Sequence, residues 1–325
     1  MSISLGRRQL FINLFGGVAA ASLFSAKPSW ASPSVTVVSG RLGWPHCVPF
    51  LATSLKLWEK YGLTVDPRDL GNGSAAAEAI AAGSSPFGYV NVPNAIALLQ
   101  VGLPIKILAA TTIGGTTVYT FNDQIKSVAD LRGKKVAIPR GVSTHALQFE
   151  MYVAPHAGLD TKRDLEIVPL APTDNITAMR RGDVDAAVSY DPYVSQAIQL
   201  GAKILVPPEK MWDGAAYSAV VIVRADFVDK QPETVRKLMQ VHSDVITFIN
   251  SKPREAAEIV NRILRGNDQD LELQLASMKS LTFTSKIDPA ALAKFANAMV
   301  QFGIIKSTPD LSQIVDSSFL PKDAV

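Results

Sequence analysis

The chain has 325 residues, of which 32 are Lys or Arg and 29 are Asp or Glu, so its formal net charge is +3 at neutral pH. This near balance excludes the basic field that a nucleic-acid-binding protein presents. Cys47 is the only cysteine, which excludes an intramolecular disulfide, and no stretch after residue 31 is long and apolar enough to span a membrane.

The first 31 residues have the features of an export signal. Arg7 and Arg8 precede an apolar run over residues 10–24, and small residues precede a predicted cleavage site after Ala31. The run is shorter than the roughly 20 residues of a membrane span, and the arginine pair resembles a twin-arginine signal. A buried N-terminal helix is the alternative, but two adjacent glycines and the lack of any acidic residue disfavour it. We therefore expect cleavage near Ala31 and a periplasmic location.

Removal of this segment changes the charge balance. The segment contains three basic residues and no acidic one, so the remaining 294 of the 325 residues carry 29 charges of each sign. Cys47 is too far from the cleavage site to serve as the lipid-modified cysteine of a lipoprotein. The sequence therefore predicts a neutral mature protein that is not tethered by lipid.

Short β-rich segments alternate with helical patterns in the first part of the mature chain. The helix candidates show apolar residues at three- and four-residue spacing, whereas the strand candidates are short apolar runs. This alternation predicts an α/β fold of mainly parallel sheet with helices on both faces. The expected elements are strand 35–39, helix 49–61, strand 63–66, helix 75–82, strand 87–90, a helix ending at residue 101 and strand 105–110.

The alternation then begins again, which predicts a second lobe. Lobe I is expected to comprise residues 32–120 plus 217–325 and lobe II residues 121–216, with crossovers near 120–122 and 214–218. The last helices begin at or near a proline, as first-turn prolines do, and should pack on lobe I. The expected elements are strand 136–139, helix 146–157, strand 166–170, helix 175–181, strands 186–189, 203–206 and 219–223, and helices 232–250, 253–264 and 289–302.

Small polar residues fill several turns that follow predicted strands. These turns span residues 71–74, 91–94, 111–115 and 141–145. Ligands bind beyond the C-terminal ends of strands in open parallel sheets, where helix starts expose backbone N–H groups. The recurrence of such turns favours a binding site for a polar or anionic group. The alternative is that Ser74, Asn94 and Ser143 are ordinary helix N-caps.

At this point the sequence resembles a known family, the nitrate/sulfonate/taurine type of ABC-transporter solute-binding proteins. The resemblance is carried in order by residues 73–83 (GSAAAEAIAAG), 130–137 (DLRGKKVA), 142–145 (VSTH), 181–187 (RGDVDAA) followed by Asp191-Pro192, and 231–250. It spans nearly the whole mature chain. It implies a two-lobed type II periplasmic-binding-protein fold with the ligand between the lobes.

The resemblance also implies a set of ligand contacts. Relatives often have Trp just before the proline-containing turn, whereas this chain has Tyr190-Asp191. A cleft-facing Asp191 would favour an ammonium, a ring N–H or hydroxyls and would disfavour a bare anion beside it. The alternative for Asp191 is a turn or N-cap residue, and the alternative for Trp44 is a core residue. The implied contacts are Trp44, His46, Ser74, Asn91 and Thr112 from lobe I, and Ser143, Thr144, His145, Tyr190 and Asp191 from lobe II.

The expected activity is binding without catalysis. The four histidines show no metal-ligand spacing, no base is identified that would activate Cys47, and neither a metal nor a cofactor is expected. The resemblance implies two partners, a small solute and an ABC permease in the inner membrane, and we expect a monomer that binds no nucleic acid. Sulfonates, taurine-like zwitterions, aromatic acids and pyrimidine vitamin precursors all remain open as ligands. The alternatives are an enzyme on the same fold, such as a pyrimidine-precursor synthase or a small-acid lyase, and a periplasmic sensor partner.

Overall fold

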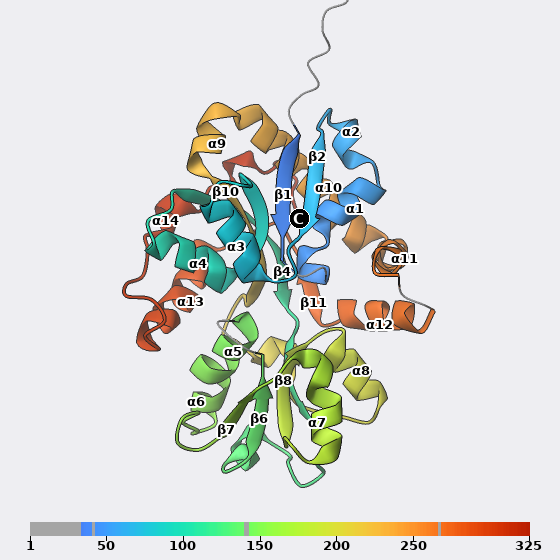
Figure 1. Ribbon diagram of the computed structural model, residues 1–325, viewed down its shortest axis with the longest axis vertical. Helices are drawn as coiled ribbons and strands as arrows, with labels where there is room; N and C mark the ends of the chain where they lie inside the picture. Colours follow the sequence, from blue (N-terminus) through green and yellow to red (C-terminus); the bar gives the residue numbers. More distant parts are fainter. Residues whose placement is uncertain (1–33, 41–42, 140–142, 266–267) are drawn as a thin grey trace, which may run out of the picture. The chain divides into compact units, whose positions relative to one another are not determined.

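The computed structural model describes residues 34–40, 43–139, 143–265 and 268–325 (Figure 1). The export signal expected over residues 1–31 lies outside this part of the chain. Residues 34–325 form one unit that contains two β-sheets. No helix in the described ranges is long and apolar enough to cross a membrane.

The first sheet has six strands in the order β11-β4-β10-β3-β1-β2. Strand β1 pairs in parallel with β2 and β3, whereas β10 runs antiparallel to β3 and β4, and β11 antiparallel to β4. The strands are β1 (Val35–Ser39), β2 (Val65–Asp69), β3 (Phe87–Asn91), β4 (Ile105–Gly114), β10 (Tyr217–Arg224) and β11 (Leu281–Phe283).

The second sheet has five strands in the order β7-β6-β8-β5-β9. Strand β6 pairs in parallel with β7 and β8, and β5 runs antiparallel to β8 and β9. The expectation of mainly parallel sheets therefore needs correction, because both sheets are mixed. The chain enters the second sheet through β5 and returns to the first through β10, and both strands run antiparallel to their neighbours. The strands are β5 (Thr116–Thr120), β6 (Lys135–Ile138), β7 (Glu166–Pro169), β8 (Ala186–Tyr190) and β9 (Lys203–Val206).

The chain passes from the first sheet to the second at Gly115, between the end of β4 and the start of β5. This point precedes the crossover expected near residues 120–122, because β5 pairs only with strands of the second sheet. Gly114 and Gly115 have φ values of 88° and 86°, which disfavour side-chain-bearing residues. The chain returns to the first sheet between Val206 and Tyr217.

Helices cover both faces of the first sheet (Figure 1). Successive strand residues point to opposite faces, so Val37 and Val221 belong to one buried cluster while Val38 and Val220 belong to another. Helices α1 (Val48–Ser54), α10 (Pro232–Ser251) and α11 (Pro253–Ile263) supply the first cluster, and α3 (Gly73–Ala81), α4 (Val92–Gln100) and α13 (Pro289–Gln301) the second. The remaining helices of this part are α2 (Leu57–Lys60), α9 (Ala225–Lys230), α12 (Asp268–Met278) and α14 (Leu311–Ile314).

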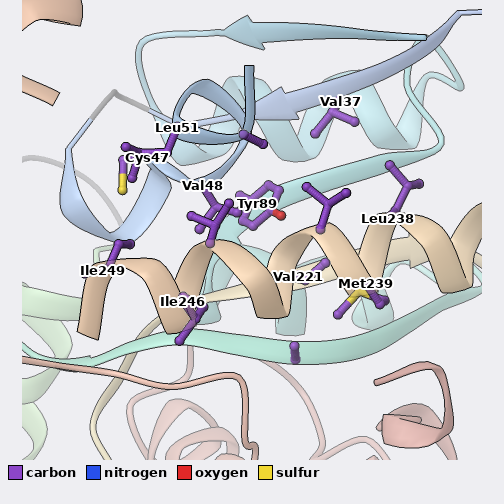
Figure 2. Close-up of a cluster of buried hydrophobic side chains, with 14 of the residues drawn as sticks. Val37, Cys47, Val48, Leu51, Tyr89, Val221, Leu238, Met239, Ile246 and Ile249 are labelled. Carbon is purple, nitrogen blue, oxygen red and sulfur yellow. The ribbon is translucent and has the colours of Figure 1, made fainter. Parts of the chain in front are cut away.

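The first cluster includes Cys47, which is buried directly before the first residue of α1 (Figure 2). Its Sγ donates to the Trp44 carbonyl oxygen at 3.2 Å, and burial raises the pKa of the thiol. Neutral and inaccessible, Cys47 packs as a small hydrophobic residue.

The second sheet is layered in the same way. On one face lie α5 (Thr144–Gln148), a π-helical turn (Phe149–Val153) and α6 (Ala154–His156), which pack on Val136 and Val188. On the other face lie α7 (Asn175–Arg181) and α8 (Tyr193–Gln199), which pack on Ala137 and Ala187.

Candidate functional site

One cavity is lined by loops from both sheets. It has a volume of about 460 Å³, which is within the range of small-molecule sites. Its walls are the segments that follow β1, β2, β3, β4, β6, β7 and β8, together with residues of β10 and β11. The C-terminal ends of the parallel strands of both sheets therefore open onto the same space, as in other open α/β sheets.

The start of α3 forms a polar wall of this cavity. Asn72 caps the helix, because its Oδ1 accepts from the Ala75 backbone N–H at 2.8 Å. The Asn94 side chain donates to Ser74 Oγ at 3.2 Å and so links the starts of α3 and α4. Asn72 and Ser74 remain exposed, so the first turn of α3 is open to a solute. Such a turn offers unpaired N–H groups and a partial positive charge.

Gly73 is required by the close approach of Asn91. A Cβ atom on Gly73 would lie 2.3 Å from Asn91 Oδ1 and 2.9 Å from Asn94 Oδ1. The Asn91 side chain in turn donates to the Ser218 carbonyl oxygen at 3.3 Å. A residue without a side chain at position 73 therefore lets the amide of Asn91 stand beside the start of α3.

The opposite wall carries a stack of aromatic rings. His145 Nδ1 lies 2.7 Å from Thr116 Oγ1, and the imidazole stacks on Tyr190 with ring centroids 4.3 Å apart and an interplanar angle of 19°. Tyr193 meets Tyr190 edge-on at 5.6 Å. Ser143 caps α5 by accepting from the Ala146 N–H at 3.1 Å. These contacts hold the rings in defined positions at the cavity.

Both histidines at the cavity are neutral at pH 7. Burial lowers the pKa of His46 to about 4, although the Tyr89 backbone, Asp69 and the Asn91 side chain act in the opposite direction. Burial lowers the pKa of His145 to about 3, and the neighbouring His46 contributes to the decrease. The described lining residues include neither Lys nor Arg. Positive potential in this part of the wall therefore comes from helix starts.

Asp191 lines the cavity, but its carboxylate is engaged within the protein. Oδ1 accepts from the Ser195 N–H at 2.9 Å and from Ser195 Oγ at 2.6 Å, and Oδ2 accepts from Ser280 Oγ at 2.5 Å. Burial raises the pKa of Asp191, while the bonds from Ser195 and Ser280 act against the increase. Asp191 thus caps the first turn of α8, which was the alternative interpretation of this residue. Its second oxygen joins α8 to the segment between α12 and β11.

The structure brings most of the predicted contact residues to one place. His46, Ser74 and Asn91 line the cavity from elements of the first sheet, and Ser143, His145, Tyr190 and Asp191 line it from elements of the second. They share a cavity because each lies at or just beyond the C-terminal end of a strand, and these strand ends of the two sheets face the same space.

Three predicted contact residues do not line the cavity. Trp44 is 3% exposed and packs edge-on against Phe283 at 5.5 Å, so its alternative interpretation as a core residue holds. Thr112 is buried inside β4, because this strand continues to Gly114 through the segment expected to be a turn. Thr144 is 1% exposed and starts α5 with its side chain turned into the protein.

Some lining residues were not predicted as contacts. Asn72 and Asn94 lie in segments whose polar character was evident, and Asn72 is the N-cap of α3. Ser74 and Asn94 lie inside the first turns of α3 and α4, so neither is the helix N-cap that the alternative interpretation expected. Tyr193 follows the proline-containing turn at Pro192. Ser218 had no local signal, since it lies within β10 and reaches the cavity only because β10 pairs with β3.

Clustered catalytic or metal-binding groups are not apparent in the described chain. Within it, no group of three or more His, Cys, Asp or Glu residues is placed to hold a metal ion. Cys47 is buried in the core, and Thr116, whose hydroxyl lies beside His145, is only 1% exposed and does not line the cavity.

Comparisons with known proteins agree with this geometry. A protein of Brucella abortus (strain 2308) that carries the general name of a binding protein is 28% identical over 281 residues, covering 82% of this chain and 85% of its own. The taurine-binding periplasmic protein of Escherichia coli K12 is 34% identical over 180 residues, or 54% of each chain. The crystal structure of the periplasmic aliphatic sulphonate binding protein of Escherichia coli superposes with a TM-score of 0.73 at 20% identity, covering 88% of this chain and 92% of that one.

The structural likeness shows that the two sheets adopt the periplasmic binding protein fold. The model of the NMT1-like family matches residues 31–264, which is well over half of the chain. The protein therefore belongs to the NMT1-like family.

Proposed function

We propose that this protein is an exported solute-binding protein that captures a small anionic organic molecule and delivers it to an ABC importer. The observation that carries this proposal is a cavity into which strand ends and helix starts of both sheets open. Relatives named as taurine-binding and aliphatic sulphonate binding proteins support it. The ligand is held between lobe I, built on the first sheet, and lobe II, built on the second, with the first lobe boundary at Gly115 instead of residue 120.

The walls favour an anion that is bound without a full opposing charge. The start of α3 offers N–H groups at Gly73 and Ser74, and the amides of Asn91 and Asn94 stand beside it. Helix starts bind sulfonate, phosphate or carboxylate groups through such donors. Asp191 does not oppose an anion strongly, because three hydrogen bonds from Ser195 and Ser280 satisfy its oxygens.

Binding without chemistry is the role that this cavity supports. His145 Nδ1 is engaged with Thr116 Oγ1, and the low pKa values of both cavity histidines make them weak bases. An efficient general base has a pKa near the working pH. We therefore propose that the bound molecule leaves unchanged, that the protein acts as a monomer, and that its partner is a permease of the inner membrane.

The test is a calorimetric titration of the purified protein with a panel of small anions and cations. The panel contains taurine, ethanesulfonate, benzenesulfonate, benzoate and nitrate, with ethylammonium and benzylammonium as cationic controls. We expect at least one organic anion to bind with a micromolar dissociation constant, about −8 kcal/mol. At one hundred times that constant, the ligand should raise the free energy of unfolding by about 2.7 kcal/mol.

The fate of the ligand distinguishes a binding protein from an enzyme on the same fold. NMR spectra of the bound anion after prolonged incubation should show the starting compound only. Conversion of the anion, or binding of cations in preference to all anions, would contradict the proposal.

A further inference from the structure

The two sides of the cavity differ in chemistry. The first-sheet side carries the amides and hydroxyls of Asn72, Ser74, Asn91 and Asn94. The second-sheet side also has polar residues, Ser143, His145 and Asp191, but among the described lining residues it alone carries aromatic rings of tyrosine, those of Tyr190 and Tyr193, together with three prolines. These are Pro139, Pro172 and Pro192. A solute that matches this cavity has a polar end and a flat apolar end.

The aromatic side is built to stay in place. Tyr190, at the end of β8, stacks on His145 of α5, and Thr116, at the start of β5, holds the His145 ring through its hydroxyl. The stack has a centroid separation of 4.3 Å, and Tyr193 closes it edge-on at 5.6 Å. Aromatic rings favour offset stacks and edge-on contacts with other rings at such separations. A ligand ring placed beside Tyr190 and Tyr193 extends the same arrangement without repacking it.

The volume of the cavity also favours a ring. The cavity encloses about 460 Å³, whereas an apolar cavity of roughly 150 Å³ is enough to hold benzene. Since one water occupies about 30 Å³ in the liquid, a nitrate or a two-carbon sulfonate leaves space for several waters against the aromatic wall. A six-membered ring with an acidic substituent takes up more of this space and displaces water from the apolar wall.

The polar end has a place at the start of α3. This helix has nine residues, and its first turn remains exposed at Asn72 and Ser74. His46 lines the same cavity, is only 6% exposed, and its Nδ1 has no hydrogen-bond partner among the described residues. An oxygen-rich acidic group at this end gains donors from the helix start.

We propose that the ligand is an aromatic acid, with a planar ring against Tyr190 and Tyr193 and a sulfonate or carboxylate at the start of α3. This inference rests on the proposed function, since it names the class of solute held in the same cavity. It separates the protein from relatives whose names refer to taurine or to aliphatic sulfonates.

The test compares matched ligands that differ only in the ring. Calorimetry measures benzenesulfonate against cyclohexanesulfonate and ethanesulfonate, and benzoate against cyclohexanecarboxylate. We expect each aromatic acid to bind about 2- to 12-fold more tightly than its saturated counterpart, the increment of one aromatic contact. The sulfonate and carboxylate pairs identify which acidic group the α3 end prefers.

Variants of Tyr193 test the wall itself. Tyr193→Leu removes the ring but keeps apolar bulk, so the aromatic acid and its saturated counterpart should bind this variant with about equal affinity. Tyr193→Phe keeps the ring and should retain the tighter binding of the aromatic acid. Tyr61→Leu is the matched control, because Tyr61 lies outside the cavity and bonds to Asp244; it should leave the preference unchanged. The wild-type comparison of ligands stands even if one variant does not fold.

Each outcome separates the two proposals. Equal or tighter binding of the saturated acids, unaffected by Tyr193→Leu, would overturn the aromatic assignment and leave the binding function intact. A protein that binds none of the acids would overturn the binding function as stated, and the aromatic assignment with it.

Discussion

Replacing Gly73 by Ala probes the polar wall most directly. The new methyl group would lie 2.3 Å from Asn91 Oδ1, whereas ordinary van der Waals contacts begin at 3.4 Å, so the amide must move by about 1 Å. Its bond to the Ser218 carbonyl oxygen, already 3.3 Å long, would be lost. One such hydrogen bond is worth about 1 kcal/mol. Alanine in a helix is favoured over glycine by about 1 kcal/mol.

The two effects should nearly cancel in stability but not in binding. We expect the free energy of unfolding of Gly73→Ala to stay within about 1 kcal/mol of the parent. The displaced Asn91 amide obstructs the start of α3, so the affinity for the tightest-binding anion of the panel should fall at least about ten-fold, or 1.4 kcal/mol. Urea denaturation and calorimetric titration of the same samples measure the two quantities.

A double-mutant cycle tests the steric reason. Asn91→Ala removes the atoms that the new methyl group would contact, so its effect on affinity should be much smaller in the Gly73→Ala background than in the parent. A coupling energy of about 0.5–3 kcal/mol is typical of residues in contact. Additive effects, or an unchanged affinity in Gly73→Ala, would refute the argument.

Two further predictions concern the buried titratable side chains. Ser280→Ala leaves Asp191 Oδ2 without its donor. Because hydrogen bonds to charged groups contribute about 1.5–3 kcal/mol, the free energy of unfolding and the ligand affinity at pH 7 should both fall. Ser318→Ala, at an exposed serine in the tail, is the control, and equal effects of the two variants would contradict the role of Ser280. His46 and His145 have folded-state pKa values of about 4 and about 3, below the ordinary 6.5. As pH falls, these histidines therefore bind protons in the unfolded chain before they do so in the folded protein. The free energy of unfolding should decrease between about pH 6.5 and pH 4, by up to about 1.4 kcal/mol per pH unit for each histidine. Burial raises the pKa of Asp191, and this effect has the opposite sign, since protonation at low pH favours the folded state. Urea denaturation between pH 7 and 4.5 measures the slope, and His145→Gln should make it shallower; an unchanged slope would show that this histidine is not buried as a neutral ring.

Local signals in the sequence predicted the elements that short-range chemistry determines. Helices α10, α11 and α13 begin at Pro232, Pro253 and Pro289, as expected from prolines in first turns. The cap at Ser143 was evident for the same reason, since a cap bonds to a backbone group only two or three residues away. The turn expected over residues 71–74 is shorter, because α3 already begins at Gly73.

Tertiary structure decided which of these turns share a cavity and which side chains point into it. Whether Trp44 faces Phe283 or a ligand, and whether Thr112 lies in a turn or in a buried strand, depends on strand pairing between distant segments. Asp191 and Ser280 are 89 positions apart, so no local pattern could reveal that one holds the other. Side-chain periodicity and capping act over a few residues, whereas the antiparallel pairing of β10 and the placement of β11 arise from packing two sheets and their helices at once.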